Sequence, residues 1–198
     1  MSIGLWVRGA RPKTLVTSIA SVMVGAVMAY VHIERSGTCI AIYPEPASCA
    51  TAREQQTLLM DRFWPVTILC LLVALFLQIA VNYANDYSDG IRGTDAGRDT
   101  DESKSGKPQR LTASGLVPAK HVLFAAMICA AIACICGVVA VVLAQAWWLL
   151  AVGVASLLAG WFYTGGKHPY GYVGLGEVGV FLFFGLAAVL GTEYALCG

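Results

Sequence analysis

Long apolar segments constrain this sequence more than any other feature. There are five of them, and each approaches the roughly 20 residues that a helix needs to cross a bilayer. Backbone polar groups within lipid must be paired inside a helix or a closed barrel, so apolar segments of this length predict helices. They cover residues 14–33, 63–84, 122–143, 147–163 and 178–196. We therefore predict an all-α, multi-span transmembrane helix bundle that forms a single membrane-embedded domain over residues 1–198.

Charged residues are few and nearly balanced. They make up 13% of the chain, with 13 basic and 12 acidic residues, whereas ordinary soluble domains carry about 25%. A neutral balance argues against nucleic-acid binding, which needs a basic surface. The lipid bilayer is the expected surrounding. The short gap at residues 144–146 predicts a tight hairpin between the third and fourth helices.

The distribution of lysine and arginine predicts the orientation in the membrane. If the N-terminus is cytoplasmic, ten basic residues lie on that side and three lie outside, which is a positive-inside pattern. The ten are Arg8, Arg11, Lys13, Arg92, Arg98, Lys104, Lys107, Arg110, Lys120 and Lys167, and the three are Arg35, Arg53 and Arg62. We expect a multi-pass protein of a bacterial plasma membrane with residues 78–110 opening to the cytoplasm.

The expected outer segment, residues 32–62, is polar and contains Pro44 and Pro46. These two prolines predict a loop without a helix. Cys39 and Cys49 lie in it and would face an oxidising compartment. A disulfide between them and a pair of free thiols are about equally compatible with the sequence.

Acidic residues gather where the second apolar segment ends. Six of the twelve fall within 17 positions, namely Asp86, Asp89, Asp95, Asp99, Asp101 and Glu102. On a helix, the polar residues Gln78, Asn82, Asn85, Asp86 and Asp89 all fall within an arc of about 100°. Polar groups at membrane depth normally face a protein interior or an aqueous cavity. We expect this face to line a cavity.

Asp86 and Asp89 are the candidate metal ligands. Three residues apart on a helix, they lie side by side, and two adjacent carboxylates need a cation to neutralise them. Mg²⁺ binds one or two carboxylates together with substrate phosphates, so the pair predicts Mg²⁺ and a diphosphate. Gly90 and Gly93 are expected to end the helix. The cations expected to fold back over the phosphates are Lys104, Lys107 and Arg110.

The alternative for this region is a solvated, salt-bridged loop without a ligand. We favour the loop for Asp99, Asp101, Glu102 and Lys104, which lie beyond the apolar segment. We favour the metal site for Asp86 and Asp89, because a purely solvated loop does not explain two carboxylates on one helix face at membrane depth.

A second polar stretch, residues 163–177, has a glycine and proline content that excludes a regular helix. Non-helical backbone at the membrane edge is tolerated where it lines a cavity, and Lys167 and His168 could meet an anionic substrate there. Departure of a diphosphate within a membrane suggests an isoprenoid donor, whose allylic cation aromatic faces stabilise. The tyrosines expected near such a cavity are Tyr83, Tyr87, Tyr163, Tyr170 and Tyr172.

The N-D-x-x-D motif at residues 85–89 resembles the first aspartate-rich motif of the UbiA-type intramembrane aromatic prenyltransferases. The strings ARPKTL, NDYSDGIRGTD, RLTASGLV, YTGG, PYGYVGLGE and FFGLAAVLGTEY resemble one branch of that family, and the resemblance covers essentially the whole chain. That branch transfers a polyprenyl group to 1,4-dihydroxy-2-naphthoate in menaquinone biosynthesis. The resemblance implies polyprenyl diphosphate and 1,4-dihydroxy-2-naphthoate as substrates and demethylmenaquinone as the product.

The resemblance also implies roles for individual residues. Asn85, Asp86 and Asp89 would bind the prenyl diphosphate through Mg²⁺. The implied catalytic set is Asp86, Asp89, Tyr163 and Lys167, and the substrate-binding set is Arg11, Asn82, Asn85, Lys107 and Arg110. Many members of the family have a third aspartate where this chain has Gly93, so Asp95 is a further candidate metal ligand.

The family usually has about nine spans and a second aspartate-rich motif, whereas five spans and one motif are expected here. The resemblance therefore implies a C-terminally incomplete enzyme domain with little or no turnover alone, for which a separate C-terminal half is a candidate partner. Three other interpretations stay open: prenyl transfer to another aromatic acceptor, a non-catalytic membrane fragment, and a transporter-like subunit. A CDP-alcohol phosphotransferase fits less well, because its D-G-x-x-A-R motif fails after Asp89 and Gly90.

Overall fold

The computed structural model describes residues 3–36, 46–93, 110–166 and 169–198, and for residues 46–49 the backbone alone. Every regular element in these ranges is helical. The elements are α1 (Ile3–Gly9), α2 (Pro12–Ser36), α3 (Pro46–Arg92), α5 (Ala119–Ala144), α6 (Leu149–Thr164), η1 (Tyr170–Val173), α7 (Gly176–Val180), η2 (Phe181–Ala187) and α8 (Ala188–Cys197). The predicted all-α, multi-span architecture is confirmed.

Four helices are long and apolar enough to cross a bilayer: Pro12–Ser36, Ala50–Arg92, Ala119–Ala144 and Gly176–Cys197. The last of these combines α7, the π-helical η2 and α8. The fourth expected span, residues 147–163, is the 16-residue helix α6, which is about 24 Å long. Because the hydrocarbon core is roughly 30 Å thick, α6 is shorter than a full crossing.

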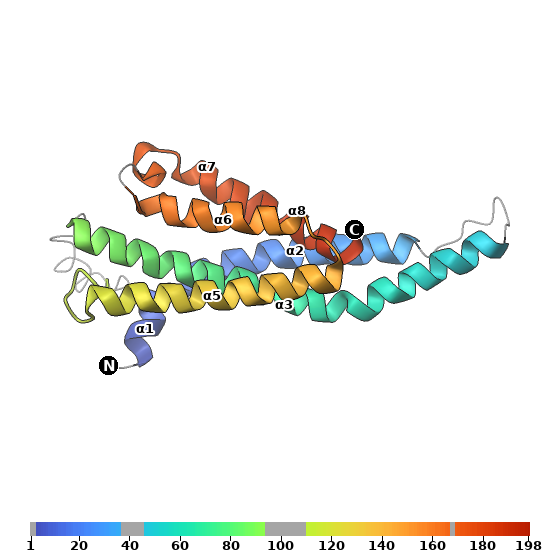
Figure 1. Ribbon diagram of the computed structural model, residues 1–198, viewed down its shortest axis with the longest axis horizontal. Helices are drawn as coiled ribbons and strands as arrows, with labels where there is room; N and C mark the ends of the chain where they lie inside the picture. The colour runs from blue at the N-terminus through green and yellow to red at the C-terminus, as the bar shows by residue number, and fades with distance from the viewer. Residues whose placement is uncertain (1–2, 37–45, 94–109, 167–168) are drawn as a thin grey trace.

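Three helices, α2, α3 and α5, run together along the long axis of the molecule (Figure 1). α3 packs most extensively on α5, while α2 packs on both α8 and α3. Figure 1 shows α6 and the α7–α8 helix lying alongside this group, and α1 leaving one end of the bundle at an angle. The arrangement brings residues near both ends of the sequence, on α2 and α8, into one contact surface.

Two clusters of buried apolar side chains mark the two ends of the bundle. One joins α1, the last turns of α3 and the start of α5, through Ala10, Tyr83, Leu111, Val117, Val122 and Ala126. The other joins the end of α2, the middle of α3 and the end of α8, through Ala26, Ala29, Ile33, Phe63, Val66, Ala144, Ala146, Ala195 and Leu196. The outer faces of the helices expose many large apolar side chains, which suits a lipid surrounding.

α3 begins much earlier than predicted. The expectation of a loop over residues 32–62 is wrong for the described part, because α2 continues to Ser36 and α3 starts at Pro46. Proline is well tolerated in the first turn of a helix, and most residues that follow are good helix formers. The first turns of α3 project beyond the other helices (Figure 1). Cys39 and the side chain of Cys49 lie outside the described residues, so the disulfide and the pair of free thiols both stay open.

Three predicted helix ends can be compared with the structure: those at Gly90, at Gly93 and at residues 144–146. The last two are correct. α3 ends at Arg92, and Gly93 follows with φ 70°, a conformation that glycine adopts without steric cost. α5 ends at Ala144 and Gln145 takes φ 57°, which confirms the tight hairpin. Gly90, however, lies inside α3, where it allows close approach of Thr112: a Cβ at this position would come 2.5 Å from the Thr112 Cβ.

Gly25 allows α2 and α8 to pack closely, and its replacement by alanine is expected to destabilise the bundle. An added Cβ would lie 3.0 Å from the Cβ of Thr192 and 3.2 Å from the carbonyl carbon of Val189. Overpacking of this kind costs about 1–3 kcal/mol, so the melting temperature in detergent should fall. Gly153→Ala is the matched control, because no atom lies within 4 Å of its added Cβ. Equal effects of the two substitutions would contradict this view of the α2–α8 contact.

Candidate active site

Asp86 joins the end of α3 to the segment that leads into α5. Its carboxylate is 2% exposed. Oδ2 accepts a hydrogen bond from the backbone N–H of Leu111 at 2.9 Å, and Oδ1 accepts one from the N–H of Thr112 at 2.8 Å. Hydrogen bonds to a charged acceptor contribute about 1.5–3 kcal/mol each. Asp86 therefore fixes this segment, including the adjoining Arg110, against α3.

Asn82 holds the corner between α1 and α2. Its side-chain nitrogen donates to the carbonyl of Ala10 at 2.8 Å and to Oγ1 of Thr14 at 2.9 Å. Arg11 lies between these two residues and has φ 54°, an uncommon left-handed conformation for a residue other than glycine. The geometry makes Asn82 the group that positions the backbone of Arg11. The substrate-binding roles predicted for both residues stay predictions.

Asn85 connects α3 to the last turn of α6. Its Oδ1 accepts a hydrogen bond from Oγ1 of Thr164 at 2.8 Å, and both side chains are buried. α6 ends at Thr164, and the described residues from there to Gly176 contain only the short 3₁₀ helix η1. The predicted absence of a regular helix over residues 163–177 is thus confirmed in the part that the structure describes.

Asp89 lies at the accessible end of the polar face, with 15% of its side chain exposed. The Tyr172 hydroxyl, on η1, donates to its Oδ1, and Nη1 of Arg110 lies 3.7 Å from its Oδ2. Arg92 donates to the carbonyl of Gly166, and its guanidinium carbon lies 5.7 Å from the centroid of the Tyr172 ring. Two segments distant in sequence therefore meet at this carboxylate, each with a hydrogen-bond donor or a cation.

The expectation that the whole polar face lines a cavity is wrong. Asn82, Asn85, Asp86 and Ser88 are buried. Hydrogen-bond partners beside them come from the α1–α2 corner, from the end of α6 and from the segment after residue 109. Buried polar groups need hydrogen-bond partners, and neighbouring segments supply these partners where an aqueous cavity was expected. Asp89 and Gln78 are the members of the face that stay partly accessible.

The candidate tyrosines take different places. Tyr83 is buried and donates to the carbonyl of Trp6 at 2.9 Å, so it supports the corner with α1. Tyr163 and Tyr170 form an edge-to-face pair with centroids 5.5 Å apart. Burial raises the pKa of Tyr170, and Tyr163 adds to this shift, so the Tyr170 hydroxyl remains neutral at physiological pH. Tyr172 is the tyrosine that contacts Asp89.

Asp86 and Asp89 could hold a Mg²⁺ ion that shares its ligands with a phosphate. An ionised carboxylate has about four acceptor positions, and the two backbone hydrogen bonds leave Asp86 with further lone pairs. Asp89 is partly accessible and has Arg110 beside it, where an anion would be attracted. Mg²⁺ uses one or two carboxylates and keeps several waters, so two acidic side chains are a sufficient protein contribution.

Several predicted site residues are not among those that the structure describes. Asp95, Lys107 and Lys167 lie outside the described ranges, as do Asp99, Asp101, Glu102, Lys104 and His168. Sequence reasoning missed Thr14 and Thr164 as hydrogen-bond partners of the polar face, and Arg92 as a contact of Gly166 and Tyr172 beside it. Thr164 follows Tyr163 in the YTGG string. Arg92 lies three residues after Asp89 on the same helix, and this spacing makes Arg92 and Asp89 neighbours on the helix surface. Both positions were therefore recognisable.

Comparison with protein-family models matches residues 57–196 to the UbiA prenyltransferase family. Three proteins named 1,4-dihydroxy-2-naphthoate octaprenyltransferase are similar to this chain. Those of Mycobacterium tuberculosis, Mycobacterium leprae and Escherichia coli are 42%, 40% and 30% identical to it, over 98%, 98% and 96% of this chain. The matches cover 54%, 54% and 52% of the relatives, so the chain spans about half of their length. No solved structure matches the chain significantly.

The family match covers most of the chain, and it includes the part of α3 that carries the aspartate-rich motif. The apolar helices that the structure describes agree with a multi-pass membrane protein. On these grounds, the chain belongs to the UbiA prenyltransferase family.

Proposed function

We propose that this chain forms the aspartate-rich part of a Mg²⁺-dependent prenyltransferase of the bacterial cell membrane. The reaction moves a polyprenyl group from its diphosphate to 1,4-dihydroxy-2-naphthoate, releases diphosphate and carbon dioxide, and gives the hydroquinone form of demethylmenaquinone. The observation that carries the proposal is the arrangement at the end of α3, where Asp89 lies within 3.7 Å of Arg110 and Asp86 fixes the segment next to Arg110. The names of the relatives support the choice of acceptor.

Mg²⁺ and the phosphate oxygens of the diphosphate would be bound by different protein groups. Asp86 and Asp89 would hold Mg²⁺, which when bound neutralises the charge that builds up on the departing diphosphate. Arg110 offers a planar guanidinium suited to two phosphate oxygens. Asp89 and Arg110 lie close enough for one ligand to bridge them.

The prenyl end would lie toward the aromatic residues of the loop before α7. When the carbon–oxygen bond to the diphosphate breaks, the electron pair leaves with the diphosphate and an allylic cation remains. The exposed ring of Tyr172 offers a π face that stabilises such a cation. The naphthoate ring carbon then forms the new carbon–carbon bond, and loss of its carboxylate as carbon dioxide restores the aromatic ring. We expect this site to face the cytoplasm, as the positive-inside pattern predicts.

A chimera tests the reaction. In it, this chain replaces the corresponding half of the Mycobacterium tuberculosis relative, to which it is 42% identical. In proteoliposomes with labelled polyprenyl diphosphate and 1,4-dihydroxy-2-naphthoate, we expect a labelled quinone-type product that forms with Mg²⁺ and disappears with a chelator. Product formation that is unchanged by metal removal would contradict the proposed Mg²⁺ dependence.

A binding measurement on the 198-residue chain tests the half-site without catalysis. A non-hydrolysable prenyl thiodiphosphate should bind to the chain in nanodiscs, and Mg²⁺ should strengthen the binding. Inorganic diphosphate should compete, because the recognised group is the diphosphate. Binding that depends on the prenyl chain alone, with no effect of Mg²⁺ or diphosphate, would remove Asp86 and Asp89 from the proposed site.

A further inference from the structure

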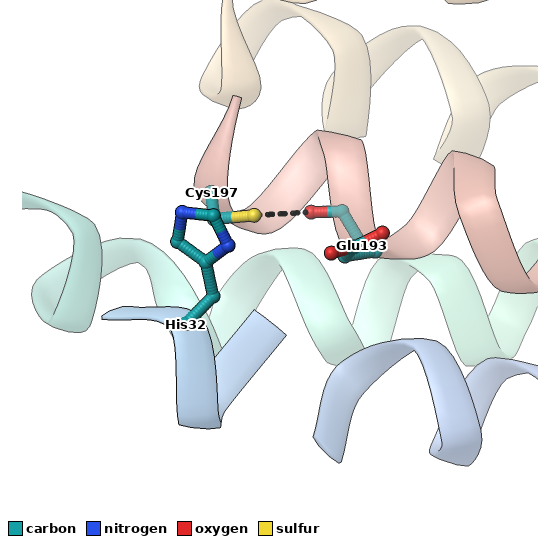
Figure 2. A group of neighbouring side chains, drawn as sticks. All are labelled: His32, Glu193 and Cys197. Carbon is teal, nitrogen blue, oxygen red and sulfur yellow. Dashed lines mark hydrogen bonds between the residues drawn. The ribbon is translucent and has the colours of Figure 1, made fainter. Parts of the chain in front are cut away.

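A second group of metal-ligating side chains lies away from the aspartate-rich motif. His32 on α2 and Glu193 and Cys197 on α8 each offer one ligand atom, and these atoms all lie within 4.8 Å of one another. Figure 2 shows the three side chains converging between the two helices. Cys197 packs against the apolar cluster that contains Ile33 and Leu196, so the group lies at the opposite end of the bundle from Asp89.

The scaffold beneath these ligands is rigid. Ile33 follows His32 and Leu196 precedes Cys197, and both are fully buried in the same cluster. Glu193 and Cys197 are four residues apart on α8, which places their side chains on one helix face. Cys197 Sγ also donates to the carbonyl oxygen of Glu193 at 3.2 Å. The backbones of α2 and α8 are therefore held in place, while the exposed His32 ring keeps the freedom to adjust.

The donor set favours a particular class of ion. One imidazole nitrogen, one carboxylate oxygen and one thiolate sulfur are the ligand types of Zn²⁺, whereas Mg²⁺ and Ca²⁺ take oxygen ligands. Four-coordinate Zn²⁺ with bonds of about 2.0–2.3 Å places its ligand atoms about 3.3–3.8 Å apart. The three atoms lie within 4.8 Å of one another, so small side-chain rotations would bring them to these values. The ionised carboxylate and thiolate together offset the two charges of the ion.

The surroundings leave room for a fourth ligand. A pocket of about 610 Å³ adjoins the group, lined by His32, Glu193, Arg35 and Ser36 together with apolar residues of α2. A water molecule could complete the coordination from this side.

We infer that His32, Glu193 and Cys197 form a binding site for a borderline transition-metal ion, with Zn²⁺ as the expected occupant, that links α2 to α8. This site is separate from the diphosphate site and does not depend on the proposed function. Its effect is structural: it connects helices whose ligands are 161 positions apart in sequence (193 minus 32). Binding to the folded state alone stabilises that state.

The test uses Co²⁺ as a spectroscopic probe for the full chain purified in detergent without added metal. We expect one equivalent of Co²⁺ to give a thiolate-to-cobalt charge-transfer band, and Zn²⁺ to abolish it by displacement. At a Zn²⁺ concentration 100 times its dissociation constant, the melting temperature should rise by about 5–10 °C. Cys197→Ser should eliminate the band, and His32→Gln and Glu193→Gln should weaken Co²⁺ binding at least about tenfold.

Matched controls separate this site from other histidines and cysteines. His121→Gln and Cys134→Ser change the same residue types on α5 and should leave Co²⁺ binding unchanged. His32→Gln keeps the test valid if Cys197→Ser does not fold, because His32 is exposed. The inference is overturned by the absence of a charge-transfer band, by a band that survives in Cys197→Ser, or by saturation only at millimolar metal.

Discussion

Asp86→Asn is expected to loosen the structure around the candidate active site as well as to abolish activity. The buried carboxylate accepts backbone hydrogen bonds from both Leu111 and Thr112. An asparagine has one acceptor oxygen, and its NH₂ group would face one of the two N–H donors. An unsatisfied buried donor costs about 1–3 kcal/mol, which lowers the melting temperature of a chain of this size by about 2–12 °C. Hydrogen exchange of the amides of Leu111 and Thr112 should accelerate.

Asp61→Asn is the matched control for this substitution. Asp61 is an exposed aspartate on the same helix, α3, so the same chemical change there should leave both the melting temperature and the exchange rates near their original values. If Asp86→Asn loses activity while the exchange of Leu111 and Thr112 stays slow, the anchoring role inferred for Asp86 is wrong and its contribution is to catalysis alone.

Asp89→Asn is expected to remove activity with little change in stability. Asp89 is partly accessible and its ion pair with Arg110 spans 3.7 Å, and such pairs contribute about 0–1 kcal/mol. Loss of a charged group that stabilises the transition state reduces turnover by about 100- to 1,000-fold. In the chimera, product formation should fall by that factor, and the Mg²⁺ concentration that gives half-maximal activity should rise.

Glu177→Gln provides the comparison for Asp89→Asn. Glu177 is an exposed acid in the first turn of α7, at the same end of the bundle, and its neutralisation should leave turnover and Mg²⁺ dependence unchanged. Retention of activity in Asp89→Asn would exclude Asp89 as the metal ligand. A large drop in melting temperature would instead show that Asp89, like Asp86, has a structural role.

The helices and the polar face of α3 were predictable because they are properties of local sequence. Apolar length predicts helices in lipid, and helical spacing places Asn82, Asn85, Asp86 and Asp89 on one face whatever surrounds them. The partners of these residues were not predictable in the same way. Leu111 and Thr112 contribute backbone N–H groups to Asp86, and every residue except proline has such a group. No residue type therefore identifies them.

The beginning of α3 shows a different limit of sequence reasoning. From the sequence, Pro46 is expected to exclude a helix, whereas it occupies the first position of one, where its missing N–H has no consequence. The following residues are polar and resemble a loop in composition, although they are good helix formers. Apolar periodicity identifies helices that pack against protein or lipid, and it gives little signal for a helix that projects away from both.

The projecting part of α3 allows an experiment that determines which side of the membrane each end of this helix faces. α3 has 47 residues and is about 70 Å long, more than twice the roughly 30 Å of the hydrocarbon core. Arg53 and Glu54 are exposed on the projecting part, and Asp89 lies at the other end of the same helix. A membrane-impermeant reagent that modifies a cysteine introduced at residue 53 in intact cells would therefore show that the aspartate-rich end faces the opposite compartment.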